Sequence, residues 1–116
     1  MKKKILFICM AVILFLTACT PKRLLYSWND YDNTSYKYLK NGDEKSVENL
    51  LKSYQQIIEK QNGTRKTVPP GIYADYGFIL LQTGKTEEGK IMLEKEIALY
   101  PESKVFIDRI LKMFEQ

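Results

Sequence analysis

The residue in this sequence with the clearest potential for chemistry is Cys19. The chain of 116 residues has two cysteines, Cys9 and Cys19, and no histidine. A thiolate is a strong nucleophile, so a cysteine in suitable surroundings can accept a covalently attached group. Cys9 lies within an apolar stretch that ends shortly before Cys19. The chemical role of Cys19 therefore depends on what kind of segment this apolar stretch is.

The stretch before Cys19 has the composition of an export leader. Lys2, Lys3 and Lys4 form a positively charged start, and residues 5–16 are almost purely apolar. An apolar region of this length is typical of signal peptides, and it is shorter than the roughly 20 residues that span a bilayer as a helix. We therefore predict that residues 1–18 are a cleaved signal peptide, with a permanent anchor helix as the alternative.

The run Leu16-Thr17-Ala18-Cys19 resembles the bacterial lipobox, in which an apolar residue stands three positions before the cysteine and a small residue directly before it. The small residue lets a lipoprotein signal peptidase approach the backbone, and the thiol takes a diacylglycerol group. The resemblance implies that Cys19 becomes the lipid-bearing first residue. Residues 19–25 then form a lipidated N-terminus and spacer, and residues 26–116 form the domain.

The same resemblance implies a location. Three acyl chains hold a protein on a bilayer surface, because each buried methylene contributes roughly 0.8 kcal/mol. Thr20 follows the cysteine in place of Asp. By similarity to enterobacterial sorting rules, this implies the outer membrane, with the domain facing the periplasm, and not the inner membrane. The domain is expected to be tethered to the membrane through its lipid.

The charge balance of the mature chain argues against nucleic acid as a partner. The full sequence has 18 Lys and Arg residues and 14 Asp and Glu residues, and three of the lysines lie in the leader. The 15 basic residues that remain nearly balance the acidic ones, and the two signs are interspersed. A protein that binds a polyanion needs a concentrated basic surface.

The sequence predicts neither an enzyme nor a bound cofactor or metal ion. Without histidine, and with its mature thiol acylated, the chain cannot build a Ser/His/Asp or Cys/His arrangement. A zinc site would have to rely on carboxylates alone. The carboxylate pairs Glu87-Glu88 and Glu94-Glu96 are expected on exposed helix faces, where their ordinary role is that of solvated charge.

The rest of the sequence is patterned for five helices and no strand, because apolar residues recur at spacings of three and four. The helices are expected to run from Tyr26 to Asn41, from an Asp43 cap to Glu59, from Pro70 to a turn at Gly84, from a Thr86 cap to Tyr100, and from a Ser103 cap onward. Residues 61–67 are polar and contain the turn signal Asn62-Gly63, so this loop is expected to be the most mobile segment.

Residues 70–103 resemble one tetratricopeptide repeat of about 34 residues. Gly77 and Gly89 fall where the two helices of such a repeat cross closely. Residues 28–61 match the frame more weakly, and the final helix would serve as the capping helix of the array. Glu96 stands where a small residue usually packs, which predicts a looser join to the final helix. The expected fold is all-α, with two tetratricopeptide-like hairpins and a C-terminal capping helix.

Four segments spread over the mature chain have a distinctive sequence: Tyr26 to Leu39, Asn41-Gly42-Asp43-Glu44, Val68-Pro69-Pro70-Gly71-Ile72-Tyr73-Ala74 and Leu99-Tyr100-Pro101-Glu102-Ser103. They resemble a family of small uncharacterised bacterial lipoproteins that carry a domain of unknown function. Members of that family are typically encoded near a lipoprotein similar to the curli-secretion pore protein. The resemblance implies a shared envelope assembly, and it assigns no chemistry.

In the tetratricopeptide frame, the first helix of each pair lines a concave surface. The positions expected to point there form a candidate partner groove: Asn29, Asp32, Tyr36, Lys40, Ala74, Phe78 and Gln82. Their mixture of apolar and hydrogen-bonding groups suits a peptide or a partner helix better than a charged polymer. The alternative is that Phe78 packs against a neighbouring helix. The eight tyrosines likewise are either core residues or interface residues.

The sequence leaves two classes of function. The first is a lipid-anchored interaction module whose groove holds another envelope lipoprotein or a protein of a secretion or surface-assembly complex. The second is an envelope protein that binds a small ligand or a glycan, or a hydrolase with two carboxylates facing each other about 5 to 10 Å apart. A shallow groove lined by Tyr and Phe would favour the first class, and a pocket with two facing buried carboxylates the second.

The lipid anchor gives the first testable prediction. Replacing the acceptor thiol, Cys19→Ala, should leave an unlipidated precursor held at the inner membrane by its uncut leader, because lipidation precedes cleavage. Electrophoretic mobility and membrane fractionation would measure this. Normal mature mobility with protein free of the membrane would contradict the lipoprotein interpretation.

Overall fold

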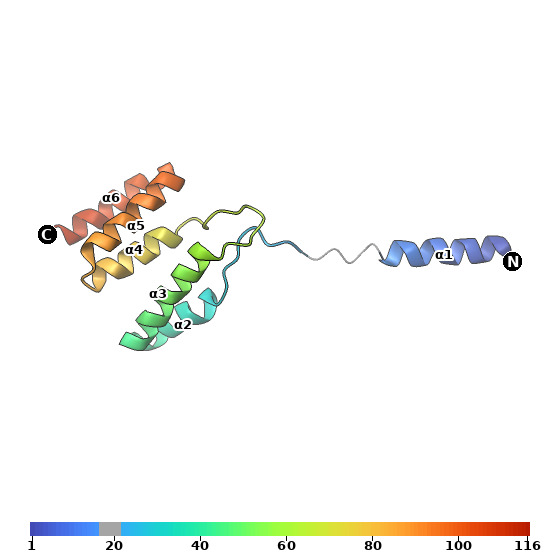
Figure 1. Ribbon diagram of the computed structural model, residues 1–116, viewed down its shortest axis with the longest axis horizontal. Helices are drawn as coiled ribbons and strands as arrows, with labels where there is room; N and C mark the ends of the chain where they lie inside the picture. Colours follow the sequence, from blue (N-terminus) through green and yellow to red (C-terminus); the bar gives the residue numbers. More distant parts are fainter. Residues whose placement is uncertain (17–21) are drawn as a thin grey trace.

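The computed structural model describes residues 1–16 and 22–116, and these residues form helices and no strand. The predicted all-α fold is confirmed. The elements, labelled in Figure 1, are α1 (Lys2–Leu16), α2 (Tyr31–Asn41), α3 (Glu44–Glu59), α4 (Ile72–Gln82), α5 (Thr86–Leu99), a short 3-10 helix η1 (Pro101–Ser103) and α6 (Lys104–Phe114).

The first helix of the domain, α2, begins at Tyr31 and not at Tyr26. Residues 22–28 are not helical, and the chain turns at Asn29, whose φ of 50° lies in the left-handed region. The N–H of Tyr31 donates to the carbonyl oxygen of Trp28 at 3.1 Å, which closes this turn. The apolar and aromatic residues before Tyr31 therefore do not pack as part of a helix.

The predicted helix caps are confirmed in part. Asp43 caps α3, because its Oδ1 accepts a hydrogen bond from the N–H of Ser46 at 2.9 Å. Thr86 is the first residue of α5 and not its cap. Ser103 precedes α6, but its hydroxyl donates back to the carbonyl oxygen of Tyr100 at 2.7 Å. The start of α6 is therefore fixed by the turn of η1.

The helices pair into two hairpins, α2 with α3 and α4 with α5, and α6 packs on the second hairpin (Figure 1). Gly77 and Gly89 face each other where α4 and α5 cross. A Cβ atom at Gly77 would lie 2.7 Å from the carbonyl oxygen of Gly89, and one at Gly89 would lie 2.9 Å from the carbonyl oxygen of Gly77. The prediction that these glycines permit a close crossing is confirmed.

The first hairpin is held by a buried polar contact. The hydroxyl of Thr34 on α2 donates to the Oγ of Ser53 on α3 at 2.8 Å, and both residues are buried. The Thr34 hydroxyl also lies within hydrogen-bond distance of the carbonyl oxygens of Asp30 and Tyr31. Small side chains at this contact let α2 and α3 approach while every buried hydroxyl keeps a partner.

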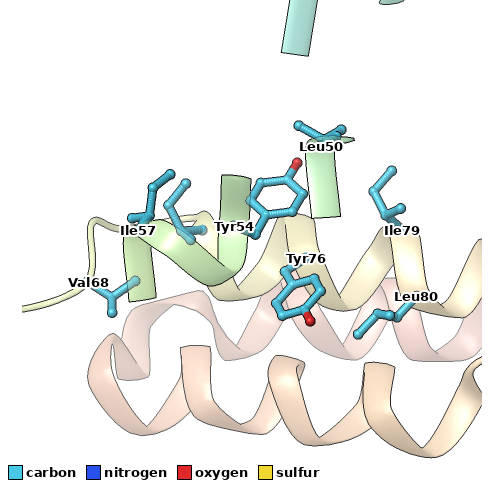
Figure 2. Packing of buried hydrophobic residues seen from close by; sticks show 8 residues of the cluster. Leu50, Tyr54, Ile57, Val68, Tyr76, Ile79 and Leu80 are labelled. Atoms are coloured by element: carbon cyan, nitrogen blue, oxygen red, sulfur yellow. The ribbon is translucent and has the colours of Figure 1, made fainter. Parts of the chain in front are cut away.

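The central helix of the domain is α4, which contributes to two apolar clusters. Toward α3 it packs Ile72, Tyr76, Ile79 and Leu80 against Leu50, Tyr54, Ile57 and Val68, most of which Figure 2 labels. Toward α5 and α6 it packs Ala74 and Leu81 against Leu93, Ile107 and Ile110. A helix that is apolar on opposite faces must be covered on both. This explains why α4 lies between α3 on one side and α5 with α6 on the other.

The N-terminal helix α1 is a separate element. Its side chains are all exposed, and it contacts none of the other described helices. Within residues 1–16 and 22–116, no helix is long and apolar enough to cross a membrane. Cys19 lies outside the described residues, so its lipidation stays a prediction.

The glycine crossing predicts a stability effect. In an exposed helix Gly→Ala is stabilising by roughly 1 kcal/mol, but Gly77→Ala would press a methyl group against the Gly89 carbonyl. We expect Gly77→Ala to destabilise the domain by about 1–3 kcal/mol, as overpacked cores do. Urea unfolding would measure the change. The exposed α3 substitution Gln56→Ala is the control, with an expected change within about 0.5 kcal/mol; equal stability of both variants would contradict the prediction.

Candidate functional site

An open apolar pocket lies where α2, α3 and α4 meet. It has a volume of about 230 Å³ and is lined by Tyr31, Ser35, Tyr38, Leu39, Leu50, Tyr54, Asp75, Phe78 and Ile79. The rim residue Leu39 is 82% exposed, and Asp75 is the one charged residue of the lining. Apolar walls with few convergent polar groups are typical of sites that bind another molecule.

One residue of the predicted groove, Phe78, lines this pocket. Its ring also packs edge-on against that of Phe114 on α6, with 5.8 Å between the ring centroids. Both descriptions drawn from the sequence therefore apply to Phe78: it contacts a neighbouring helix with one part of the ring and faces the pocket with another. Phe114, itself 40% exposed, extends the aromatic surface toward the C-terminal helix.

The other predicted groove residues do not lie together in the pocket. Ala74 is buried against α5 and α6, so the prediction that it faces the groove is corrected; α4 is apolar on two faces, and the periodicity placed Ala74 on the wrong one. The remaining positions are accounted for elsewhere: Asn29 and Asp32 line an adjoining hollow, Tyr36 and Lys40 form an exposed cation–π pair, and Gln82 is exposed at the end of α4.

The charged group of the pocket, Asp75, is exposed at its edge, with the carboxylate against the apolar lining. The hydroxyl of Tyr31 makes a long hydrogen bond of 3.5 Å to the Asp75 carboxylate. Burial of that carboxyl group raises the pKa of Asp75 above its ordinary value, and the bond from Tyr31 opposes the shift only in part. Burial likewise raises the pKa of Tyr31 and of Tyr54, and the nearby Asp75 charge adds to both shifts. The pocket therefore favours a neutral Asp75 or a cation beside it.

A continuous series of aromatic rings leads from the pocket to the N-terminal part of the domain. Successive ring centroids lie 6.3 Å apart for Tyr26 and Trp28, 5.7 Å for Trp28 and Tyr31, 5.8 Å for Tyr31 and Tyr54, and 5.6 Å for Tyr54 and Tyr76. Tyr54 and Tyr76 are buried core residues, whereas Tyr31 is half-buried at the pocket. Tyr54 and Tyr76 therefore have the core role, and an interface role for the half-buried Tyr31 stays a prediction.

The N-terminal residues 24–28, here called the strap, are bound to the loop between α3 and α4. The N–H groups of Thr64 and Arg65 donate to the carbonyl oxygens of Leu24 and Leu25 at 3.0 and 3.1 Å. Both backbone groups of Ser27 form hydrogen bonds with the Gln61 side chain. The Ser27 N–H donates to Gln61 Oε1 at 2.6 Å, and the Ser27 carbonyl oxygen accepts from Gln61 Nε2 at 3.2 Å. Leu24 and Leu25 thus belong to the folded domain.

The strap and the loop touch backbone to backbone at Gly63. A Cβ atom there would overlap the carbonyl oxygen of Leu25 and the Cα of Tyr26. The far part of the loop is bound as well, because the Tyr100 hydroxyl donates to the carbonyl oxygen of Val68 at 2.6 Å. The loop that the sequence predicted to be mobile is therefore fastened at both ends.

Glu96 differs from the other acidic residues of α5. Glu87, Glu88 and Glu94 are exposed as expected, but Glu96 is only 2% exposed. Its Oε1 accepts a hydrogen bond from the N–H of Gly71 at 2.8 Å, at the start of α4, while its Oε2 has no hydrogen-bond partner in the described structure. A carboxylate is favourable at a helix N-terminus, so Glu96 joins α5 to the start of α4. The exposed position expected for Glu96 is therefore wrong, and the looser join to the final helix stays a prediction.

The model of one protein family, the domain of unknown function DUF4810, matches residues 25–110. The chain belongs to the DUF4810 family. The match begins within the strap and includes every residue that lines the pocket, so both features belong to the DUF4810 domain itself. No curated protein and no solved structure matches the chain.

The environment of Asp75 predicts a pH-dependent gain in stability. Because folding raises the pKa of Asp75, its protonated form favours the folded state, and that contribution is present below the unfolded pKa and lost as the pH rises through the folded pKa. Asp75→Asn in this DUF4810 domain should therefore raise the urea midpoint at pH 7 and leave it nearly unchanged at pH 3.

A control of opposite sign is available for this prediction. Hydrogen bonding to Ser46 lowers the pKa of Asp43, so Asp43 contributes stability above its unfolded pKa that is lost as the pH falls. Asp43→Ala should lower the midpoint at pH 7 and have a smaller effect at pH 3. A lower midpoint for Asp75→Asn at pH 7 would show that Asp75 stabilises the fold and would contradict the interpretation of the pocket.

Proposed function

We propose that this protein is a lipid-anchored interaction module of the bacterial cell envelope, and that its pocket holds an apolar segment of another envelope protein. The observation that carries the proposal is the open pocket of α2, α3 and α4, with its exposed apolar rim and its single carboxylate. The expected chemistry of the bound segment is an aliphatic or aromatic side chain next to a Lys, an Arg or a hydroxyl group.

The charge of the pocket supports this choice of partner. The ion pairs of the described residues, Lys52 with Glu48 and Lys104 with Asp108, leave Asp75 without a cation. A carboxylate with a raised pKa beside apolar walls gains most from a partner that brings a positive charge or a hydrogen-bond donor. A groove of this kind holds a helix or a short segment through a few anchoring side chains.

The same pocket argues against the glycosidase alternative. Glycoside hydrolysis uses two carboxylates across one cleft, and a single carboxylate, Asp75, lines this pocket. The buried Glu96 does not line this pocket, and its Oε1 accepts a hydrogen bond from the N–H of Gly71. Binding of a small apolar ligand in the pocket is the remaining alternative, and the experiment below separates it from a protein partner.

The proposed anchor rests on the leader. The resemblance of residues 16–19 to the lipobox and the apolar residues 5–16 support export and lipidation at Cys19. The exposed apolar surface of α1 also calls for a membrane or a protein environment, because such a surface is unfavourable in water. The resemblance to lipoproteins encoded near a curli-secretion-type lipoprotein supports a secretion or surface-assembly complex as the partner, at the outer membrane facing the periplasm.

Site-specific crosslinking tests the proposed function. A photo-crosslinking amino acid at Leu39, on the rim of the pocket, should give one discrete adduct with an envelope protein in intact cells. The same amino acid at Tyr36, which is exposed on α2 outside the pocket lining, is the matched control and should give no such adduct. Adding Phe78→Ala, with folding checked by circular dichroism, should abolish the adduct from Leu39.

The outcomes distinguish the candidate functions. An adduct from Leu39 that persists with Phe78→Ala would contradict the pocket as the contact site. Absence of any protein adduct, together with a small molecule retained in native mass spectrometry, would favour the ligand-binding alternative. Cys9→Ala serves as a control for the anchor, because this variant should be lipidated and processed normally.

A further inference from the structure

The strap and the adjoining loop carry an exposed apolar surface. Leu24 is 69% and Leu25 is 55% exposed, although their carbonyl groups are fixed by the loop. Trp28 is partly exposed and lines a hollow together with Leu24. Aliphatic residues and an amphipathic Trp on a fixed backbone form a surface of the kind that favours a membrane interface.

Basic residues flank this apolar surface on the side of the loop, whereas Asp32 lines the hollow on the side of Trp28. Arg23 and Lys66 line a second hollow together with Leu24, and the N–H of Arg65 donates to the carbonyl oxygen of Leu25. Residues 22–28 and 60–68 contain five Lys or Arg residues and no Asp or Glu. These two segments of the nearly neutral mature chain thus carry a local excess of positive charge. Lys and Arg near a bilayer attract anionic headgroups.

The sequence distance to the proposed lipid sets how far this surface can lie from the bilayer. Leu24, the first residue of the strap, lies five positions after Cys19, a span of at most about 18 Å when fully extended. Because the strap is bound to the loop between α3 and α4, the lipid cannot swing away from this part of the domain. In Figure 1 the chain enters the domain at this same loop.

We propose that Arg23, Leu24, Leu25, Trp28, Arg65 and Lys66, here called the basal patch, dock the domain on the surface of an anionic bilayer. This inference rests on the lipid anchor of the proposed function. The bilayer takes Leu24, Leu25 and Trp28 at the depth of its headgroups, and the three basic side chains pair with lipid phosphates. Docking fixes one orientation of the domain relative to the membrane.

The docked orientation has a consequence for the pocket. Trp28 of the basal patch contacts Tyr31, which lines the pocket. The pocket therefore opens close to the bilayer and at a fixed height, where it meets the membrane-proximal segments of other envelope proteins. A freely tethered domain would present the pocket in all directions.

The only tryptophan of the chain, Trp28, reports on docking directly. The full-length lipidated protein is reconstituted in vesicles of phosphatidylcholine with about 30 mol% phosphatidylglycerol, a fraction of anionic lipid that gives a marked surface potential. A nitroxide-labelled lipid with its label just below the headgroups then quenches Trp28 if the basal patch is docked. We expect strong quenching, and weaker quenching in vesicles of phosphatidylcholine alone.

Two double variants test the role of charge. Arg23→Gln with Arg65→Gln should lower the ratio of docked to undocked protein by roughly fivefold for each charge removed. Lys85→Gln with Lys112→Gln removes the same charge from exposed positions outside the basal patch and should leave quenching unchanged. Unquenched Trp28 in wild type on anionic vesicles, or equal loss of quenching in both double variants, would overturn the inference.

Mass spectrometry of the N-terminal fragment shows whether Cys19 carries lipid. It therefore distinguishes failure of the basal patch from failure of the lipid anchor. Lipid on Cys19 with an unquenched Trp28 overturns the basal patch and keeps the anchor. Quenching that depends on Arg23 and Arg65 in a chain without lipid on Cys19 supports the basal patch and removes the anchor. The crosslinking of the pocket is independent of both results.

Discussion

The arrangement of the domain depends on a contact between two backbones, at Gly63, where no side chain can be fitted. This contact joins the strap to the loop between the hairpins, and the hydrogen bonds of Ser27 with Gln61 hold it in register. The same loop is bound further along by Tyr100 and by Glu96, whose carboxylate receives the first N–H of the second hairpin. The loop therefore sets the relative position of the two hairpins, with the apolar cluster of α3 and α4 filling the space between them.

The pocket exists because three helices meet without closing. α2 contributes Tyr31, α3 contributes Tyr54 and α4 contributes Asp75. Burial raises the pKa of each of these groups, and the Asp75 charge adds to the shifts of the two tyrosines. A closed core would replace such a carboxylate by an apolar residue or supply it with a cation. Asp75 instead lies exposed at the edge of an apolar hollow, where its carboxylate is accessible to a binding partner.

The sequence predicted the features that depend on local chemistry. The helices after Gly42, the Asp43 cap and the Gly77–Gly89 crossing all follow from periodicity and residue type, and the structure has them. The pocket and the strap depend on residues far apart in the chain: Tyr31 meets Asp75 over 44 positions, and Ser27 meets Gln61 over 34. No local pattern marks such pairs. The exposed position predicted for Glu96 was wrong for the same reason, since its hydrogen-bond partner Gly71 lies 25 positions earlier.

The strap also imposes an order of events on folding. Ser27 cannot be bound until Gln61 and Gly63 are present, and closing a loop of that length costs conformational entropy that only a formed α2–α3 hairpin repays. Because the chain is synthesised from its N-terminus, residues 24–28 remain unpaired while about 35 further residues are added. During that interval the carbonyl groups of Leu24 and Leu25 are open to solvent, and closure of the strap afterwards pairs them with the N–H groups of Thr64 and Arg65. The strap therefore closes only after the first hairpin has formed, and its hydrogen bonds then hold the N-terminal residues against the loop.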